Sequence, residues 1–246
     1  EHKAMLSLGK VHHANEIVKF AESKSLVGMI KCDGLSIRLT YEDGKLVRGE
    51  TRGNGIDGSE VTMHVKQFEN IPLSIDKEGL YVVDGEAIIT EKDFATINDA
   101  LPEGVEKFKN SRNLASGTLS LLDTSLVKER KLRFVLWDVI KGESKASFIG
   151  CLSAAENLGF TVVPYQLVED TLNEDLIDFY NSRILDRAKE LGYPCDGVVW
   201  KFDDIAYGES KGQTSHHFNN AVAYKFKDDT YETTLREIEW SMGKTG

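Results

Sequence analysis

The sequence lacks any apolar run near the length that crosses a membrane, and it contains only 4 prolines and 3 cysteines. A membrane-spanning helix needs about 20 consecutive apolar residues, so we expect no membrane partner. The cysteines, Cys32, Cys151 and Cys195, are odd in number and have no paired spacing. This argues against a disulfide framework and a four-cysteine zinc site. The simplest location that this composition predicts is a reducing cytoplasm.

Positive charge is also scarce, since 30 Lys and Arg stand against 40 Asp and Glu, for a net charge of −10. Neutralisation of phosphates by Lys and Arg supplies most non-specific affinity for nucleic acid. A surface of this charge is unfavourable for gripping DNA as a whole, so such contacts must come from a local patch or from other domains. At 246 residues and 41% hydrophobic content, the chain is nevertheless long enough to bury a sizeable core.

Hydrophobic spacing predicts an irregular alternation of helices and short strands. The expected helices are 14–24, 91–101, 111–122 with a cap at Asn110-Ser111, 153–158 and 172–191. The expected strands are 26–39 with a tight turn at Asp33-Gly34, then 80–90, 132–140, 196–202, 221–226 and 233–240. Asp43-Gly44 predicts the turn of a hairpin. Together these features favour an α+β fold of mostly antiparallel sheets flanked by helices over a doubly wound fold.

Three lysines occur at the ends of apolar strand patterns, at Lys31, Lys201 and Lys225. Because side chains alternate along a strand, Val199 and Lys201 should share one face with Gly197, and Asp196 should lie on the other. Such a face suits a nucleotide whose base lies on Val199 and whose phosphate reaches Lys201. The alternative is that these lysines are ordinary solvated surface residues.

Six motifs extend this pattern over nearly the whole chain. They are Lys31-Cys-Asp-Gly, Thr51-Arg-Gly-Asn-Gly-Ile-Asp-Gly-Ser-Glu-Val-Thr, Asp84-Gly-Glu86, Asn110-Ser-Arg-Asn-Leu-Ala-Ser-Gly, Asp196-Gly-Val-Val-Trp-Lys201 and Ala223-Tyr-Lys225-Phe-Lys. In order and spacing they resemble the motifs of NAD-dependent DNA ligases, in the nucleotidyltransferase (adenylation) domain. The resemblance implies the nucleotidyltransferase fold, with NAD and Mg²⁺ as cofactors and nicked double-stranded DNA as the partner.

The resemblance also implies roles for the catalytic residues. Lys31 corresponds to the nucleophile that accepts AMP, and the cations Lys201 and Lys225 would favour its neutral amine and stabilise charge on phosphorus. Glu86 resembles the acidic residue near the ribose, the lysine and a divalent metal ion. A solvent-facing carboxylate is the alternative for Glu86.

Further residues resemble those that bind the nucleotide. Trp137 aligns with the aromatic residue that stacks on adenine, although a core tryptophan is the alternative. Arg52 and Arg112 resemble arginines that contact the nucleotide or the 5′-phosphate of DNA, because a guanidinium offers a planar fork of donors. A structural salt bridge is their alternative. The remaining residues that the resemblance places against the nucleotide are Ser7, Leu8, Ile30 and Val199.

Three positions depart from the family pattern. Met29 stands where the family has a glutamate that accepts a hydrogen bond from adenine, which a methionine side chain cannot do well. Ser120 and Ala188 stand where arginines are usual, and Arg187 and Lys189 are candidate substitutes for the second.

The resemblance predicts that residues 1–246 form a single adenylation domain, and that the chain is a monomer. The N-terminal domain that binds nicotinamide mononucleotide (NMN) is expected to be missing, as are the oligonucleotide-binding, zinc-binding, helix-hairpin-helix and BRCT domains. An excised domain, or a part of a compact or split ligase of phage or other viral type, would fit this picture. Two alternatives stay open: an ATP-dependent DNA or RNA ligase or capping enzyme, and a catalytically weakened nucleotide-binding subunit.

Overall fold

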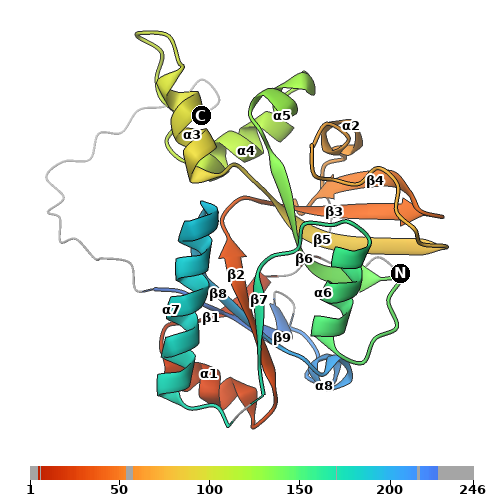
Figure 1. Cartoon of the computed structure of the whole chain (residues 1–246), viewed down its shortest axis with the longest axis vertical. Helices are drawn as coiled ribbons and strands as arrows, with labels where there is room; N and C mark the ends of the chain where they lie inside the picture. The colour runs from red at the N-terminus through yellow and green to blue at the C-terminus, as the bar shows by residue number, and fades with distance from the viewer. Residues whose placement is uncertain (1–4, 6, 54–57, 170, 215–216, 227–246) are drawn as a thin grey trace, which may run out of the picture.

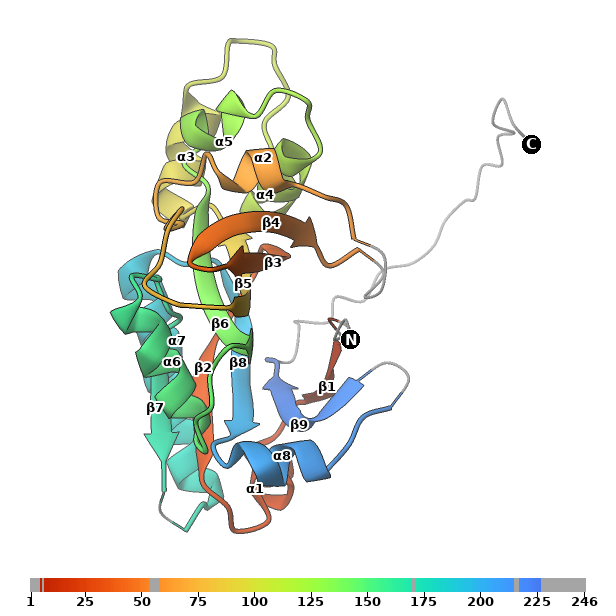
Figure 2. The ribbon, with the colours of Figure 1, turned by 90° about the vertical axis from the view of Figure 1, so that its right-hand side faces the viewer.

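The computed structural model describes residues 5, 7–53, 58–169, 171–214 and 217–226. In these residues, nine strands form two sheets (Figures 1 and 2). The five-stranded sheet has the order β1 (Ser7–Val11), β9 (His217–Tyr224), β8 (Cys195–Phe202), β2 (Leu26–Cys32) and β7 (Tyr165–Val168). The four-stranded sheet has the order β4 (Lys45–Thr51), β3 (Leu35–Glu42), β5 (Leu80–Ile88) and β6 (Arg133–Lys141).

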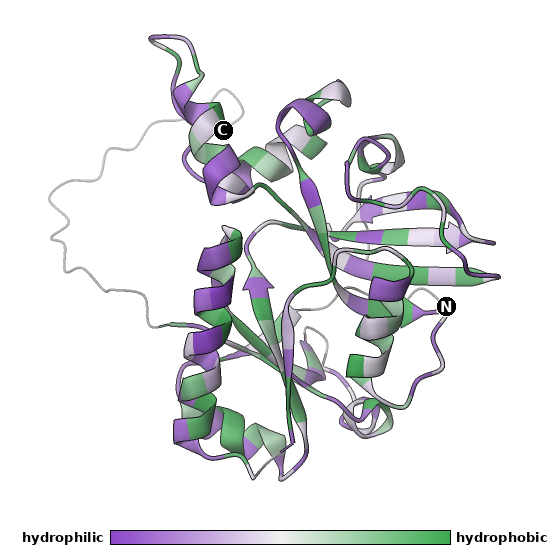
Figure 3. Cartoon of the chain, viewed as in Figure 1, coloured by the Kyte–Doolittle hydropathy of each residue, from purple (hydrophilic) through white to green (hydrophobic). Residues whose placement is uncertain are grey.

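Eight helices surround these sheets (Figure 1). They are α1 (Ala14–Ala21), α2 (Thr62–Val65), α3 (Glu91–Asp99), α4 (Ser111–Leu119), α5 (Ser125–Glu129), α6 (Phe148–Asn157), α7 (Glu174–Leu191) and α8 (Ile205–Ser210). Helix α7 covers β2 and β8, and Gly28 of β2 leaves room for Ile184 and Trp200, which an added Cβ would meet at 2.8 and 2.9 Å. Figure 3 colours the ribbon by hydropathy, and green apolar residues are interspersed with purple hydrophilic ones along the helices and strands.

The α+β class with mostly antiparallel sheets is confirmed, and of the described strand pairs only β1 with β9 is parallel. The Asp43-Gly44 hairpin is confirmed, with positive φ at both residues (45° and 77°), as a tight two-residue turn requires. Asn110 caps α4 as expected, accepting from the Asn113 amide at 2.7 Å. The helix predicted at 153–158 begins earlier, at Phe148. The strand predicted at 233–240 lies outside the described residues.

The two sheets are joined by the turn at Asp33-Gly34. Strands β2 and β3 follow each other in sequence but belong to different sheets, so this turn does not close a hairpin. A Cβ on Gly34 would lie 2.1 Å from the carbonyl oxygen of Ala87, which explains the glycine. Lys31 therefore lies close to the point where the chain passes from one sheet to the other. Among the described residues, no helix is both long and apolar enough to cross a membrane.

Candidate active site

A cleft of about 920 Å³ is lined by residues of both sheets, including β1 of the five-stranded sheet, and by residues of α4. Every site residue predicted from the sequence lines it: Ser7, Leu8, Ile30, Lys31, Arg52, Glu86, Arg112, Trp137, Val199, Lys201 and Lys225. The fold thus gathers residues that are up to 218 positions apart, from Ser7 to Lys225 (225 − 7 = 218), into one cavity. Lys31 reaches it from the end of β2, an interior strand, and not from an edge strand.

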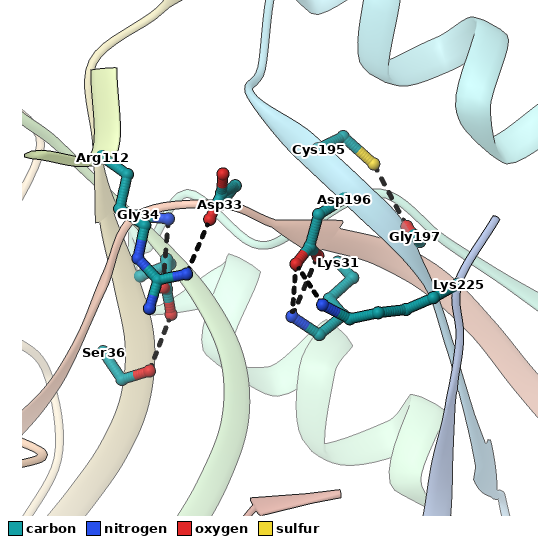
Figure 4. Close-up of polar contacts among 10 residues, drawn as sticks. Lys31, Asp33, Gly34, Ser36, Arg112, Cys195, Asp196, Gly197 and Lys225 are labelled. Carbon is teal, nitrogen blue, oxygen red and sulfur yellow. Dashed lines mark hydrogen bonds and ion pairs between the residues drawn. The ribbon is translucent and has the colours of Figure 1, made fainter. Parts of the chain in front are cut away.

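Two of the three lysines share one carboxylate (Figure 4). The Lys31 amine donates to both oxygens of Asp196, at 2.9 and 3.2 Å, and the Lys225 amine donates to one of them at 2.7 Å. Burial opposes ionisation of Asp196, but the hydrogen bonds from Lys225 and Lys31 lower its pKa overall. Asp196 is therefore an anion that holds the two amines together.

The placement of Asp196 corrects the prediction that it lies on the face opposite Lys201. The pairing register of β2 and β8 shifts between Lys31 and Cys32, so that Lys31 lies opposite Gly197 and Cys32 opposite Cys195. Asp196 is the extra residue of this bulge, and a bulge re-aims a side chain that simple alternation would send elsewhere. Sequence reasoning assigned no role to Asp196, because a bulge has no reliable signal in one strand taken alone.

The third lysine has its own carboxylate from the other sheet. Lys201 of β8 donates to Asp138 of β6 at 2.7 Å, and the two side chains are only 12% and 16% exposed. The Lys201 amine also lies 3.9 Å from the ring centroid of Phe148, within range of a cation–π contact. Asp138, which lines the cleft, was not predicted as a site residue.

Glu86 occupies the junction of the sheets beside the turn. Its carboxylate accepts from the Gly34 amide at 3.2 Å and from the Ser36 hydroxyl at 2.9 Å. Burial raises the pKa of Glu86 to about 7, and the opposing effects of Ser36 and Lys31 are smaller. Glu86 can therefore gain or lose a proton near neutral pH, a property that is common at functional sites. It is not a fully solvent-facing carboxylate.

The two arginines approach the cleft from different elements. Arg112, at the start of α4, donates to Asp33 at 3.1 Å, yet its side chain is 59% exposed. Arg52 donates to the Met5 carbonyl at 3.0 Å and to the Ser7 hydroxyl. Part of the glycine-containing run that follows Arg52, residues 54–57, lies outside the described residues, as does Lys227.

Apolar side chains line the cleft from both sheets. Trp137 of β6 is partly exposed there, beside a register shift between β5 and β6, so it is not a fully buried core tryptophan. Val199 of β8 is partly exposed in the same cleft, and Met29 is its partner on β2. A flat apolar ring would find contact surface on both walls.

The positions that depart from the family pattern differ in where they lie. Met29 and Ser120 line the cleft, and Met29 is only 2% exposed. Ala188 is buried on α7 and does not line it. Arg187 pairs with Glu190 and Lys189 with Asp186, both on the outer side of α7. The expectation that Arg187 or Lys189 replaces a missing site arginine is wrong.

Comparison with known proteins identifies the family. The model of the NAD-dependent DNA ligase adenylation domain matches residues 1–229. The DNA ligase of Lachnoclostridium phytofermentans is 39% identical over 246 residues, which are 99% of this chain and 37% of that protein. The DNA ligase of Ruminiclostridium cellulolyticum is 36% identical over 250 residues, with the same two shares. The chain thus spans little more than a third of the length of these relatives.

Solved structures agree on the fold alone. A putative ATP-dependent DNA ligase from Aquifex aeolicus matches with a TM-score of 0.53 and 15% identity, over 91% of this chain and 50% of that chain. An archaeal ATP-dependent RNA ligase matches with a TM-score of 0.51 and 13% identity, over 91% and 48%. ATP-dependent ligases share the fold, whereas the sequence match is to NAD-dependent DNA ligases. The chain therefore belongs to the NAD-dependent DNA ligase adenylation domain family.

Proposed function

We propose that the chain takes AMP from NAD onto Lys31 and passes it to the 5′-phosphate of nicked DNA. The neutral Lys31 amine attacks the α-phosphorus, an N–P bond forms, and the P–O bond to the departing NMN breaks. A phosphate oxygen at the nick then displaces the lysine, and the 3′-hydroxyl displaces AMP. The observation that carries the proposal is the position of Lys31 in the cleft beside Lys225. Both lysines lie in the part of the chain, residues 1–229, that matches the family model.

The lysine must change partners before it reacts. The Lys31 amine donates to Asp196 at 2.9 Å, so it has to leave this carboxylate before its nitrogen can attack phosphorus. A phosphate that enters the cleft offers Lys225 and Lys201 an alternative anion. Held against the phosphorus, these two cations would stabilise the charge that develops there.

The apolar and polar linings fit the two ends of a nucleotide. Stacking between Trp137 and Val199 would hold adenine, because aromatic and aliphatic surfaces accept a flat base. Ser7, Leu8 and Ile30 lie along the same cleft and would contact the adenosine. Arg52 and Arg112 would serve phosphates, either of NAD or of the 5′-end of the nick.

The carboxylates of the cleft would bind magnesium only together with phosphate oxygens of the substrate. Among the described residues, no three His, Cys, Asp or Glu side chains are grouped to hold a metal ion. Mg²⁺ commonly binds through one or two carboxylates, waters and substrate phosphates. Glu86 would supply one such carboxylate, and the ion, when bound, would neutralise phosphate charge.

We also propose that residues 1–246 act as a single adenylation domain within DNA repair and replication in the cytoplasm. An NMN-binding domain, and the further ligase domains, would come from the same protein or from separate subunits. Nicked double-stranded DNA is the proposed partner, and the domain itself is proposed to be monomeric. The net charge of −10 is consistent with leaving most of the DNA grip to those other domains.

Intact-mass measurement tests the first step. The protein is incubated with NAD and magnesium, alone and with an added NMN-binding domain from a ligase relative. We expect a mass gain of one adenylyl group, lost in Lys31→Ala and kept in the matched control Lys189→Ala, whose side chain is 80% exposed on α7. A parallel sample with ATP should label more slowly. No adduct with NAD under either condition, or an adduct that survives Lys31→Ala, would refute the proposal.

A further inference from the structure

Two of the three cysteines lie opposite each other next to the reactive lysine. Cys32 follows Lys31 on β2, and Cys195 precedes Asp196 on β8. Their Cα atoms are partners in the antiparallel pairing of these strands. The cysteines are 163 positions apart in sequence (195 − 32 = 163), so only the fold reveals the pair.

The pairing geometry suits a disulfide. Residues directly opposite in an antiparallel pair have Cα atoms about 4.5 to 5.5 Å apart, with side chains on the same side. Disulfides need Cα atoms roughly 4.4 to 6.8 Å apart. Both thiols are free in the structure, and the third cysteine, Cys151, is buried on α6.

The two cysteines differ in what they border. Cys32, next to Lys31 on β2, is one of the residues that line the cleft. Cys195 lines a separate hollow of about 530 Å³, together with Ala188 of α7 and Tyr193. Figure 4 shows the Cys195 sulfur directed away from the Lys31–Asp196 contact. A small molecule can therefore reach Cys195 without entering the cleft.

We propose that Cys32 and Cys195 are a modification site for low-molecular-weight disulfides, which oxidise the pair to an internal disulfide and so stop adenylation of Lys31. The Cys195 thiolate attacks one sulfur of the small disulfide, forms a mixed disulfide and releases the first thiol. The Cys32 thiolate then attacks the Cys195 sulfur and releases the second thiol. Two protein thiols and one small disulfide thus yield one protein disulfide and two small thiols.

The order of attack follows from the surroundings of each thiol. Burial raises the pKa of Cys32 well above its usual value, with Glu86 and Cys195 adding to the effect. Burial also raises the pKa of Cys195. Cys195 is the one that borders the open hollow, so it is the first to react. Both thiols are mostly protonated at neutral pH, so the pair responds to sustained oxidation and not to brief exposure.

The disulfide would act on the active site through Gly197. The Cys195 thiol donates to the Gly197 carbonyl at 3.1 Å, and this contact is lost when the thiol hydrogen is removed. Gly197 is the pairing partner of Lys31, and a Cβ on it would meet the Tyr224 carbonyl at 2.1 Å. Oxidation therefore changes a tightly packed segment between Lys31, Asp196 and Lys225. A misplacement of about 1 Å near reacting groups can cost about 100-fold in rate.

The experiment treats the chain with oxidised glutathione and follows two quantities. Alkylation and peptide mass mapping report whether Cys32 and Cys195 are joined. The rate of AMP transfer to Lys31 is measured before oxidation, after oxidation and after reduction with dithiothreitol. We expect a Cys32–Cys195 crosslink, a rate at least about tenfold lower, and full recovery on reduction.

Matched variants separate this site from general oxidation. Cys195→Ser should lose no rate in oxidised glutathione relative to its own rate before oxidation, and Cys195→Ala replaces it if the serine variant fails to fold. Cys32→Ser should stop at the mixed disulfide on Cys195 and form no internal crosslink. Cys151→Ser should stay as sensitive as the parent protein. In the parent protein, absence of the crosslink, a mixed disulfide that stops at Cys195, or a crosslinked protein with an unchanged rate would each overturn the proposal.

The rate readout rests on the proposed function, whereas the crosslink does not. If reduced protein never forms the lysyl-AMP adduct, the proposed function fails, while the mass map still decides whether the cysteines pair.

Discussion

Replacement of Glu86 by glutamine should remove a pH-dependent cost in stability. Glu86 has a pKa of about 7 in the folded protein, against an ordinary value of 4.5. The folded protein thus holds this proton more tightly than the unfolded chain. Protonated Glu86 therefore stabilises the folded protein relative to the unfolded chain. This contribution is complete below pH 4.5 and is lost as the pH rises to about 7.

The size of the effect follows from the shift. A rise of about 2.5 pKa units, at about 1.36 kcal/mol each, amounts to about 3 kcal/mol. Glutamine mimics the protonated acid, since its oxygen can accept from the Gly34 amide while its NH₂ group donates to Ser36. Glu86→Gln should therefore gain up to about 3 kcal/mol over the parent protein between pH 4.5 and 8.

Urea unfolding of both proteins at several pH values, without nucleotide, measures this difference. Subtracting the parent from the variant cancels the carboxylates that titrate in the opposite direction, such as Asp196. Glu103→Gln, on an exposed loop, controls for the loss of one surface carboxylate. A difference that is constant with pH, or that favours the parent at high pH, would refute the assignment of burial as the dominant influence on Glu86.

Three further outcomes are expected. Trp137→Ala should weaken AMP binding by about 1–3 kcal/mol in calorimetry, the usual worth of a base–aromatic stack, while Trp137→Phe should keep most of it; an unchanged affinity would show that the ring does not stack. Asp84→Ala should lower the free energy of unfolding by about 3–5 kcal/mol, because it removes the buried partner that Arg38 contacts at 2.7 and 2.8 Å; urea titration measures this, and a loss under about 1 kcal/mol would contradict it. Discrimination between NAD and its hypoxanthine analogue should be about tenfold or less in adduct rate, because Met29 offers adenine no good acceptor; a much larger ratio would reveal another acceptor.

Local patterns predicted the elements that carry the site. The Asp43-Gly44 turn and the Asn110 cap depend on a few neighbouring residues, and both are confirmed. Long apolar periodicity likewise predicted α7 and the strands β5, β6 and β8 to within two residues at each end. The short elements β7, α2, α5 and α8 were not predicted, because four to six residues carry too little periodicity.

Contacts between distant segments could not be predicted from local sequence patterns. Asp138 meets Lys201 because two sheets face each other, and nothing in either strand shows this pairing. Asp196 turns toward Lys31 at a bulge that depends on how β2 and β8 align. The motif resemblance supplied what local pattern could not, by naming residues that the fold then brought into one cleft.

The carboxylates beside the cleft cations have a consequence for how affinity responds to salt. Lys31 and Lys225 share Asp196, Lys201 pairs with Asp138, and Arg112 with Asp33. An arriving phosphate therefore replaces an anion that is tethered to the protein, and the net charge of each contact changes little. Salt screens exposed charges over about 8 Å at physiological strength, but here it has little unbalanced attraction to screen. Ionic strength should hardly alter the part of the nucleotide affinity that these four cations contribute, and that part then depends on the shape of the phosphate and not on an excess of positive charge.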